Sequence, residues 1–238
     1  MNARDPLRWS WRREAPHLAL VVGIVAASVI AWPFVDEPVP MHWNARGEVD
    51  GWGSRLEALG IMPVVTVFLY LLLAFIPRVD PGRANYASMA GAYGAIRLAV
   101  VLMMAVVQGA LIAAAFGWAD GPGWMIPVAV GVLFIIIGNV LGKLRPNYFA
   151  GVRTPWTLAS TKSWNATHRL AGWVFAGFGV LLMAMAVVRR DWFVVASLVV
   201  MGLGLVWTAV YSYLVWKHDP NPVPVTGTRP SEPPTEGQ

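Results

Sequence analysis

Six long apolar runs dominate the sequence and decide what the chain can fold into. Each is 18 residues or longer, and none contains Asp, Glu, Lys, Arg or His. About 20 apolar residues suffice to cross the roughly 30 Å of hydrocarbon in a bilayer. The sequence therefore predicts an all-α integral membrane protein, a bundle of about six transmembrane helices. The predicted spans are Leu18–Val35, Leu59–Ile76, Leu98–Trp118, Trp124–Leu141, Leu170–Val188 and Trp192–Trp216.

Charge and cysteine content exclude several classes of function. Only 13% of the residues are charged, about half the share of a typical soluble domain. The net charge is +5, but the basic residues flank the apolar runs, so we expect anionic lipid headgroups rather than nucleic acid as their partner. The chain has no cysteine, which excludes disulfides, thiolate metal sites and cysteine nucleophiles.

The distribution of Lys and Arg predicts the orientation in the membrane. Fourteen of the 18 lie in the segments on one side of the predicted spans, which places both termini in the cytoplasm. Tryptophans agree, because Trp32, Trp118, Trp124 and Trp192 fall at outer span ends and Trp216 at an inner one. The first span follows a basic segment, residues 1–17, but is too long for a secretory signal, so it is read as an uncleaved anchor. Residues 217–238 are rich in Pro, Thr and Glu and predict a disordered cytoplasmic tail.

The predicted outer loop, residues 36–58, is rich in polar and turn-forming residues. One interpretation is a surface that recognises a ligand outside the cell, with His42, Asn44, Gly47, Glu48 and Asp50 as its candidates. In a sharper version, His42 binds a metal together with Glu48 or Asp50, but no spacing here fixes two ligands on one face. A folded cap, in which Asn44 and Asp50 bond nearby backbone in Asx turns, is favoured over a metal site. No metal or other cofactor is predicted.

The predicted inner loop, residues 143–169, is long and mixes tryptophans with five basic residues. It could dock Trp156 and Trp164 at the headgroup level with its arginines on lipid phosphates, or it could form a protein-docking surface. Its second half is compatible with a helix, which would place Trp164 and His168 on one face, and Arg169 and Trp173 likewise. The plainer alternative is that His168 and Arg169 only anchor the next span.

Few polar residues lie inside the predicted spans. Gln108, Asn139, Thr66 and Thr208 are the main ones, and interhelical hydrogen bonding is their expected role. A proton-coupled carrier would usually show an intramembrane carboxylate or His, which argues against a transport path. Two pairs of small residues at four-residue spacing, Gly109/Ala113 and Gly172/Ala176, favour close helix packing.

The inner stretch closely resembles the signature of the SdpI family, bacterial membrane proteins named for immunity against a secreted killing peptide. The residues that carry this resemblance are Gly138, Asn139, Lys143–Asn147, Gly151–Leu158, Trp164, Thr167–Arg169 and Gly172. The outer stretch Pro40–Asn44, Gly47 and Asp50–Ser54 resembles the small domain of unknown function that precedes the signature in many members. Residues 18–77 would hold this domain with the first two spans, and residues 78–216 the four-span SdpI-like region.

The resemblance implies a protein of the bacterial cytoplasmic membrane that confers toxin immunity. In the founding system, such a protein also holds a transcriptional repressor at the membrane. The positions that the resemblance marks as functional are Asn139, Arg145, Asn147, Arg153, Trp156, Trp164, His168 and Arg169. Members often carry an acidic residue shortly before the tryptophan matched by Trp164, whereas this chain has Ser160–Ser163. Any partner contact made by that acid would be altered here.

We therefore expect an immunity protein with a secreted toxin peptide and a cytoplasmic repressor as partners, and no enzyme activity. Two other classes stay open. A small transporter or channel would need a polar path through Gln108 and Asn139. A membrane enzyme would need His42 or His168 as an acid–base group, although no nucleophile–base pair is recognisable.

Overall fold

The computed structural model describes residues 10–118 and 122–224. Six helices in these ranges are long and apolar enough to cross a membrane, which makes the chain a multi-pass membrane protein. A seventh, α5, is short. The helices are α1 (Trp11–Ala31), α2 (Met62–Val79), α3 (Ala90–Ala115), α4 (Pro122–Leu141), α5 (Pro155–Ala159), α6 (Thr161–Val188) and α7 (Asp191–Lys217).

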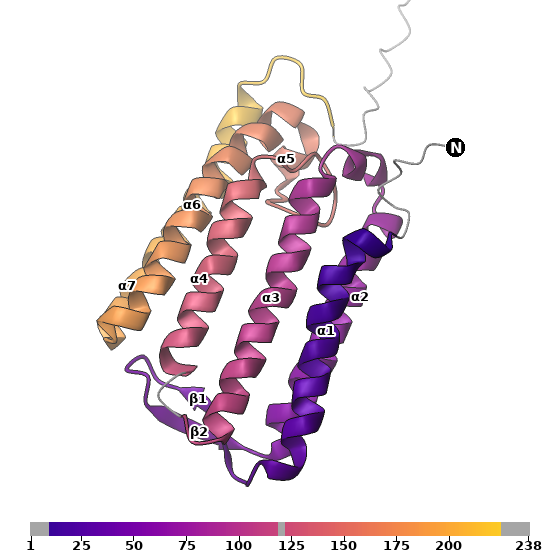
Figure 1. Ribbon diagram of the computed structural model, residues 1–238. Coiled ribbons are helices and arrows are strands. Elements are labelled where there is room, and N and C mark those ends of the chain that lie inside the picture. The colour runs from indigo at the N-terminus through magenta and orange to yellow at the C-terminus, as the bar shows by residue number, and fades with distance from the viewer. Residues whose placement is uncertain (1–9, 119–121, 225–238) are drawn as a thin grey trace, which may run out of the picture.

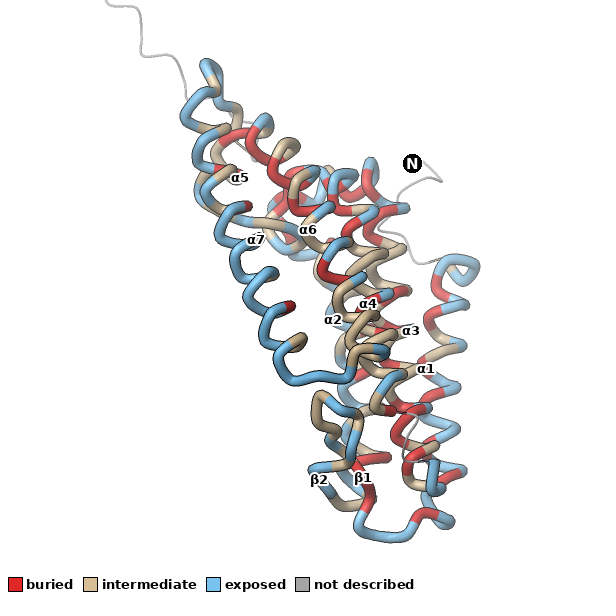
Figure 2. The backbone as a smooth tube through the Cα atoms, turned by 90° about the vertical axis from the view of Figure 1, so that its left-hand side faces the viewer, coloured by how far each residue is buried: buried red, intermediate tan, exposed pale blue. Residues whose placement is uncertain are grey.

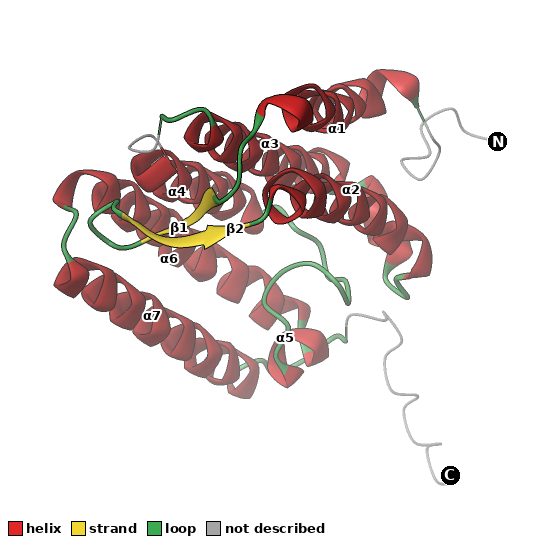
Figure 3. Ribbon diagram, turned by 90° about the horizontal axis from the view of Figure 1, so that it is seen from below, coloured by secondary structure: helices red, strands yellow, loops and turns green. Residues whose placement is uncertain are grey.

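The long helices run alternately up and down and stand side by side (Figure 1). The α3 helix packs against α1, α2 and α4, while α6 packs between α4 and α7. One end of the bundle carries a β-hairpin and is called the hairpin end here. The opposite end carries α5 and is called the α5 end (Figures 1 and 3).

The β-hairpin departs from the predicted all-α fold. Strand β1 (Val39–Trp43) pairs antiparallel with β2 (Val49–Gly53), and the register is irregular around His42. The hairpin lies across the hairpin end of the bundle (Figure 3). Its base is fastened by an apolar cluster in which Val35 and Val39 are buried against Ala31, Ala58 and Leu59. These contacts connect the hairpin to the end of α1 and the start of α2.

Three helices begin further toward the α5 end than the predicted spans do. The sequence placed the first, third and fifth spans from Leu18, Leu98 and Leu170, but the helices begin at Trp11, Ala90 and Thr161. These extra turns contain ionisable residues, which the search for charge-free runs excluded. The first turns of α6 and all of α5 therefore fall within the predicted inner loop.

Much of the apolar surface is exposed, as the burial colouring shows for α7 in particular (Figure 2). Leu198 and Leu203 of α7 are 58% and 65% exposed, whereas Ser197, Thr208 and Ser212 on the same helix are buried. An apolar outer face with a buried polar stripe is the reverse of a soluble helix and is typical of a lipid-facing one. The described surface thus fits a lipid bilayer as its surroundings.

Helices α4 and α6 approach each other closely at glycines. A Cβ atom on Gly138 would lie 2.6 Å from the Gly172 carbonyl oxygen, and one on Gly131 would lie 2.6 Å from the Gly179 carbonyl oxygen. The predicted close packing at Gly172 and Ala176 is therefore confirmed. The same prediction for Gly109 is wrong, because nothing lies within 4 Å of a Cβ built there.

The first part of the predicted disordered tail is fixed to the bundle. The Val223 carbonyl accepts hydrogen bonds from the backbone N–H and the hydroxyl of Thr161, and Ser160 Oγ donates to Asp219. Residues 218–224 are thus ordered by polar contacts with the start of α6, which sequence composition does not reveal. The rest of the tail, 225–238, and residues 1–9 of the basic segment lie outside the described residues.

Candidate functional site

The predicted inner loop folds into a compact cap at the α5 end, which we call the α5-end cap (residues 143–168). Its local signals are two helix N-caps. Thr154 and Thr157 form a capping box around Pro155, and the Ser160 hydroxyl accepts a hydrogen bond from the Ser163 N–H to start α6. Such caps satisfy N–H groups that have no partner inside the helix.

Trp164 and His168 form the centre of the cap. Both are fully buried, and their rings stack with centroids 4.0 Å apart, which confirms that they share a helix face. The Trp164 indole N–H donates to the Leu144 carbonyl at 2.9 Å. Because Trp164 is buried, it does not dock at the headgroup level, which was one of the two interpretations of this loop.

Both ring nitrogens of His168 are occupied. Nε2 accepts from the Val152 N–H at 3.0 Å, so Nδ1 carries the proton and donates to the Trp164 carbonyl at 2.8 Å. Gly151 makes this contact possible, because its φ is +106° and a Cβ there would overlap the imidazole. An imidazole held in this way orders the loop and has no free nitrogen for acid–base work.

Asn147 and Asp80 order the other half of the cap. The side-chain oxygen of Asn147 accepts from the backbone N–H groups of Phe149 and Ala150, and its side-chain NH₂ group donates to the backbone carbonyls of Arg145 and Ala150. The Asp80 carboxylate, which follows α2, accepts from the Tyr148 N–H at 3.1 Å and from its own turn at Gly82.

Tyr86 completes the buried set around Asp80. Its hydroxyl donates to Asp80 Oδ2 at 2.9 Å, and burial together with this hydrogen bond raises the pKa of Tyr86. Sequence reasoning missed Asp80 and Tyr86. The Asp80-Pro81-Gly82 turn directly after a span was the available signal.

The remaining predicted inner residues lie on the surface of the cap or beside it. Arg145, Arg153 and Arg169 are exposed, as is Asn139 near the end of α4. Arg153 donates to the Tyr148 carbonyl at 2.9 Å, and Trp156 packs edge-on against Tyr213 of α7. Of the eight predicted positions, Asn147, Trp164 and His168 are thus buried and order the cap, Trp156 is half-buried against α7, and the other four are exposed.

A buried ion pair near the α5 end was also not predicted from the sequence. Both Arg97 Nη atoms contact the Glu14 carboxylate, at 2.7 and 3.0 Å, and the Tyr70 hydroxyl donates to the same carboxylate at 3.0 Å. The Glu14 and Arg97 side chains are only 11% and 13% exposed. The pair fastens α1 to α3 across 83 positions of sequence, and Tyr70 adds α2.

The polar residues of the predicted spans differ in the hydrogen bonds that they make. Gln108 donates to Ser28 Oγ at 3.0 Å and to the Ala58 carbonyl at 3.2 Å, which confirms its interhelical role. Thr66 and Thr208 instead bond carbonyls one turn earlier in their own helices, so their predicted interhelical bonds are not seen. The same prediction for Asn139 is wrong, because its side chain is exposed and makes no hydrogen bond within the described residues.

At the hairpin end, the turn of the hairpin is ordered by Asn44. Its side-chain oxygen accepts from the N–H groups of Arg46 and Glu48, which confirms the predicted Asx turn, and Gly47 follows with φ +81°. Hydrogen bonds from Asn44 and Arg46 lower the pKa of Glu48. Asp50 does not form an Asx turn of this kind. It pairs with His42 Nδ1 at 2.5 Å across the strands.

The hairpin tip encloses a hollow of about 320 Å³, which we call the hairpin groove. One wall is the hairpin, and the other is the hairpin end of α4, α6 and α7. Gly47 at the tip lies against Gly123 of α4, and Arg46 reaches to within 3.9 Å of Asp191 at the start of α7. The groove is lined by Met41, His42, Trp43, Asn44, Ala45, Pro122, Gly123, Ile126, Pro127, Met185 and Val194.

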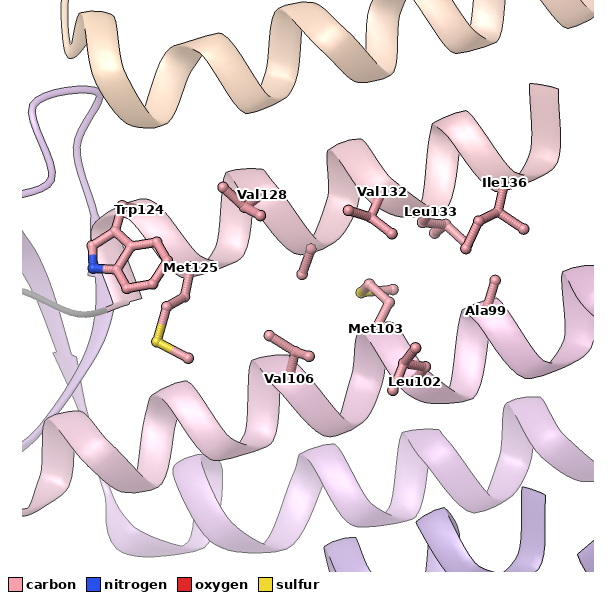
Figure 4. Close-up of a pocket in the computed structure, with 11 residues that line it drawn as sticks. Ala99, Leu102, Met103, Val106, Trp124, Met125, Val128, Val132, Leu133 and Ile136 are labelled. Atoms are coloured by element: carbon pink, nitrogen blue, oxygen red, sulfur yellow. The ribbon is translucent and has the colours of Figure 1, made fainter. Parts of the chain in front are cut away.

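A second hollow, of about 200 Å³, lies between α3 and α4 within the bundle (Figure 4). Trp124 closes it toward the hairpin end, and aliphatic side chains such as Met103, Val128 and Ile136 line it elsewhere. The crevice contains no ionisable side chain, so it suits an acyl chain or another apolar group. Within residues 10–118 and 122–224, no group of three His, Cys, Asp or Glu could hold a metal ion.

Comparison with known proteins relates both ends of the bundle to described sequence families. The profile of the SdpI/YfhL protein family matches residues 143–212, from the α5-end cap into α7. That of a domain of unknown function, DUF1648, matches residues 19–67, which include the hairpin. The immunity protein SdpI of Bacillus subtilis (strain 168) is 23% identical over 190 residues, covering 80% of this chain and 89% of that protein. No solved structure matches.

These matches include the buried Trp164–His168 centre and the hairpin alike, and the relative that they point to is named as an immunity protein. Residues 143–212 of the chain match the SdpI/YfhL family, residues 19–67 match DUF1648, and the chain is a distant homologue of the immunity protein SdpI.

Proposed function

We propose that this protein protects the bacterial cytoplasmic membrane against a secreted, membrane-active peptide, which it receives in the hairpin groove. The hairpin end then faces outward and the α5 end faces the cytoplasm. Fourteen of the 18 Lys and Arg lie on the α5-end side, which supports this orientation by the positive-inside rule. The name of the relative, an immunity protein, supports the activity.

The single observation that carries the proposal is the composition and place of the hairpin groove. Its lining is mainly apolar, with the His42 ring and the Asn44 amide among its polar groups, and it opens beside the ends of three spanning helices. Ligand sites are typically apolar hollows with a few placed polar groups that set orientation. A peptide that enters a bilayer from outside would meet this groove at the depth where its apolar side chains leave water.

Glu48 and Asp50 do not line the groove but position the polar residues that do. Asp50 orients the His42 ring through Nδ1, while Glu48 holds the turn through Asn44 and Arg46. Gly47 keeps the tip close to α4. The five predicted outer residues therefore act as one unit, in which His42 and Asn44 contact the peptide and the others position them.

Filling the groove tests the proposal. Ala45→Trp places a large ring in the groove, and the matched control Leu56→Trp adds the same ring at an exposed position on the same end of the bundle. The chain and its variants are expressed in a host killed by candidate peptides, and survival is titrated at equal membrane expression. We expect the native chain and the control to protect and Ala45→Trp to lose most protection. Equal protection by both variants would overturn the groove as the site, and no protection by the native chain against any peptide would overturn immunity.

We further propose that the exposed face of the α5-end cap docks a cytoplasmic repressor. Arg145 and Arg153 are exposed there, beside Phe149 at 42% exposure, on a loop that the buried residues hold in one shape. Arginine and aromatic residues on a preorganised surface are typical of interface hot spots. Arg145→Ala with Arg153→Ala should release a co-expressed repressor from membranes, with the exposed Arg83→Ala as the control. Unchanged membrane recovery of the repressor in the double variant would contradict this role.

A further inference from the structure

A groove between α4 and α6 at the α5 end is independent of the proposed immunity function. Its floor is backbone, because the helices touch at Gly138 and Gly172, and the Arg169 side chain crosses over Gly142. The hollow measures about 330 Å³. It is lined by Gly138, Asn139, Gly142 and Lys143 from α4 and the turn after it, and by Arg169, Gly172, Trp173 and Ala176 from α6.

The charges of the groove are unbalanced. Lys143 and Arg169 both line it, and none of the lining residues is acidic. Within the described part of the chain, the side chains of Lys143, Arg169 and Asn139 make no hydrogen bond or ion pair, unlike those of Arg97 or Arg153. Two cations and an amide thus converge on one hollow with their donors unused. Arg and Lys donors of this kind bind phosphate oxygens strongly.

The depth of the groove selects the form of the phosphate. Lys143 lies just beyond the end of α4, and Asn139 lies about one turn before Lys143, inside the helix. On α6, Trp173 is one turn, about 6 Å, deeper than Arg169, and it is 80% exposed on a helix long enough to span the membrane. The cations therefore sit at headgroup depth, while Trp173 and Ala176 continue the groove into the hydrocarbon. Basic pockets between spanning helices are where anionic phospholipids bind.

We propose that this groove is a site for one anionic phospholipid. Lys143, Arg169 and the Asn139 amide hold the phosphate, and an acyl chain lies over the glycine floor against Trp173. An occupant with an acyl chain is favoured over free phosphate because the groove is continuous with the apolar face of α6.

Native mass spectrometry of the purified full chain tests the site, with phosphatidylglycerol, phosphatidylcholine or inorganic phosphate added to the detergent. The native chain should bind phosphatidylglycerol at least tenfold more tightly than phosphatidylcholine, and inorganic phosphate should not compete at millimolar concentration. Lys143→Gln with Arg169→Gln should abolish this preference. The affinity of this double variant for phosphatidylglycerol should fall on the order of tenfold to thirtyfold. Each of the two basic residues contributes about 1 kcal/mol near the membrane surface, and each 1.4 kcal/mol corresponds to a tenfold change in affinity.

Lys162→Gln with Lys217→Gln removes the same charge at the same end of the bundle but outside the groove, and it should keep the native preference. Asn139→Leu leaves both cations in place, so it tests the site even if the double variant does not fold, and it should weaken phosphatidylglycerol binding several-fold. Native affinity in a folded double variant would overturn the proposal. Equal losses in the two double variants would show diffuse attraction rather than a site, and competition by inorganic phosphate would show that the groove binds the free anion.

Discussion

Separating Glu14 from Arg97 should destabilise the bundle more than any single exposed substitution. The pair has two contacts, at 2.7 and 3.0 Å, between side chains that are 11% and 13% exposed. Two unit charges about 4 Å apart, a typical separation of the charge centres in such a pair, attract by about 4 kcal/mol at an effective dielectric constant near 20. Removing one partner leaves the other charge buried and unpaired, which costs about 3–5 kcal/mol. We therefore expect a loss of that size in the free energy of unfolding for Arg97→Met and, similarly, for Glu14→Gln.

The double variant separates this explanation from a loss of packing. With both charges gone, the only remaining losses are shape and the charge-assisted hydrogen bond from Tyr70, together about 1–2 kcal/mol. The sum of the two single losses in the free energy of unfolding should then exceed the loss in the double variant by at least about 3 kcal/mol, which is a strongly non-additive cycle. The assay is equilibrium unfolding in mixed micelles, followed by tryptophan fluorescence, with the exposed Arg83→Met as the control. Additive single effects would refute the reasoning and show that the pair contributes nothing as a pair.

Three further outcomes follow from buried hydrogen bonds. His168→Leu leaves the partly buried Val152 N–H without its acceptor and should cost about 1–3 kcal/mol in the same unfolding assay; a neutral effect would contradict the assigned role. Gly151→Ala places a methyl group against the His168 ring at a residue whose φ is +106°, so it should destabilise the cap at least as much. The expected sign is faster proteolysis within residues 143–160, and unchanged proteolysis would count against this prediction. Gln108→Leu removes the bond to Ser28 and should lower stability by only about 1 kcal/mol, while a loss of several kcal/mol would show a larger role in the bundle.

The six spans are predictable from sequence because a helix surrounded by lipid must consist mainly of apolar residues, and this is visible in local composition. A run without charges needs no tertiary information to be recognised. The helix ends were less predictable, because local composition alone assigns charged residues such as Glu14 and Arg97 to loops. Only the fold brings them together, across 83 positions, and turns two costly buried charges into one neutral pair.

The candidate site was predictable where the signal is local. Trp164 and His168 are four residues apart, so helical spacing alone placed them on one face. Asn44 sets its turn through residues two and four positions on, which is also local. The burial of Trp164 and His168, by contrast, depends on segments 20 and 16 positions away in the sequence, which contain Leu144 and Val152. Composition therefore could not separate the residues that order the cap from those that face a ligand.

The orientation of the two ends is the claim on which the proposed immunity depends, and one labelling experiment tests it most directly. Because the chain has no cysteine, single exposed positions give clean reporters: Glu48→Cys in the hairpin and Lys162→Cys at the α5 end. Intact cells are treated with a membrane-impermeant maleimide, and permeabilised cells serve as the reference. The account predicts that the hairpin position is labelled in intact cells and that the α5-end position is labelled only after permeabilisation. The opposite pattern would contradict it and would place the hairpin groove out of reach of a secreted peptide.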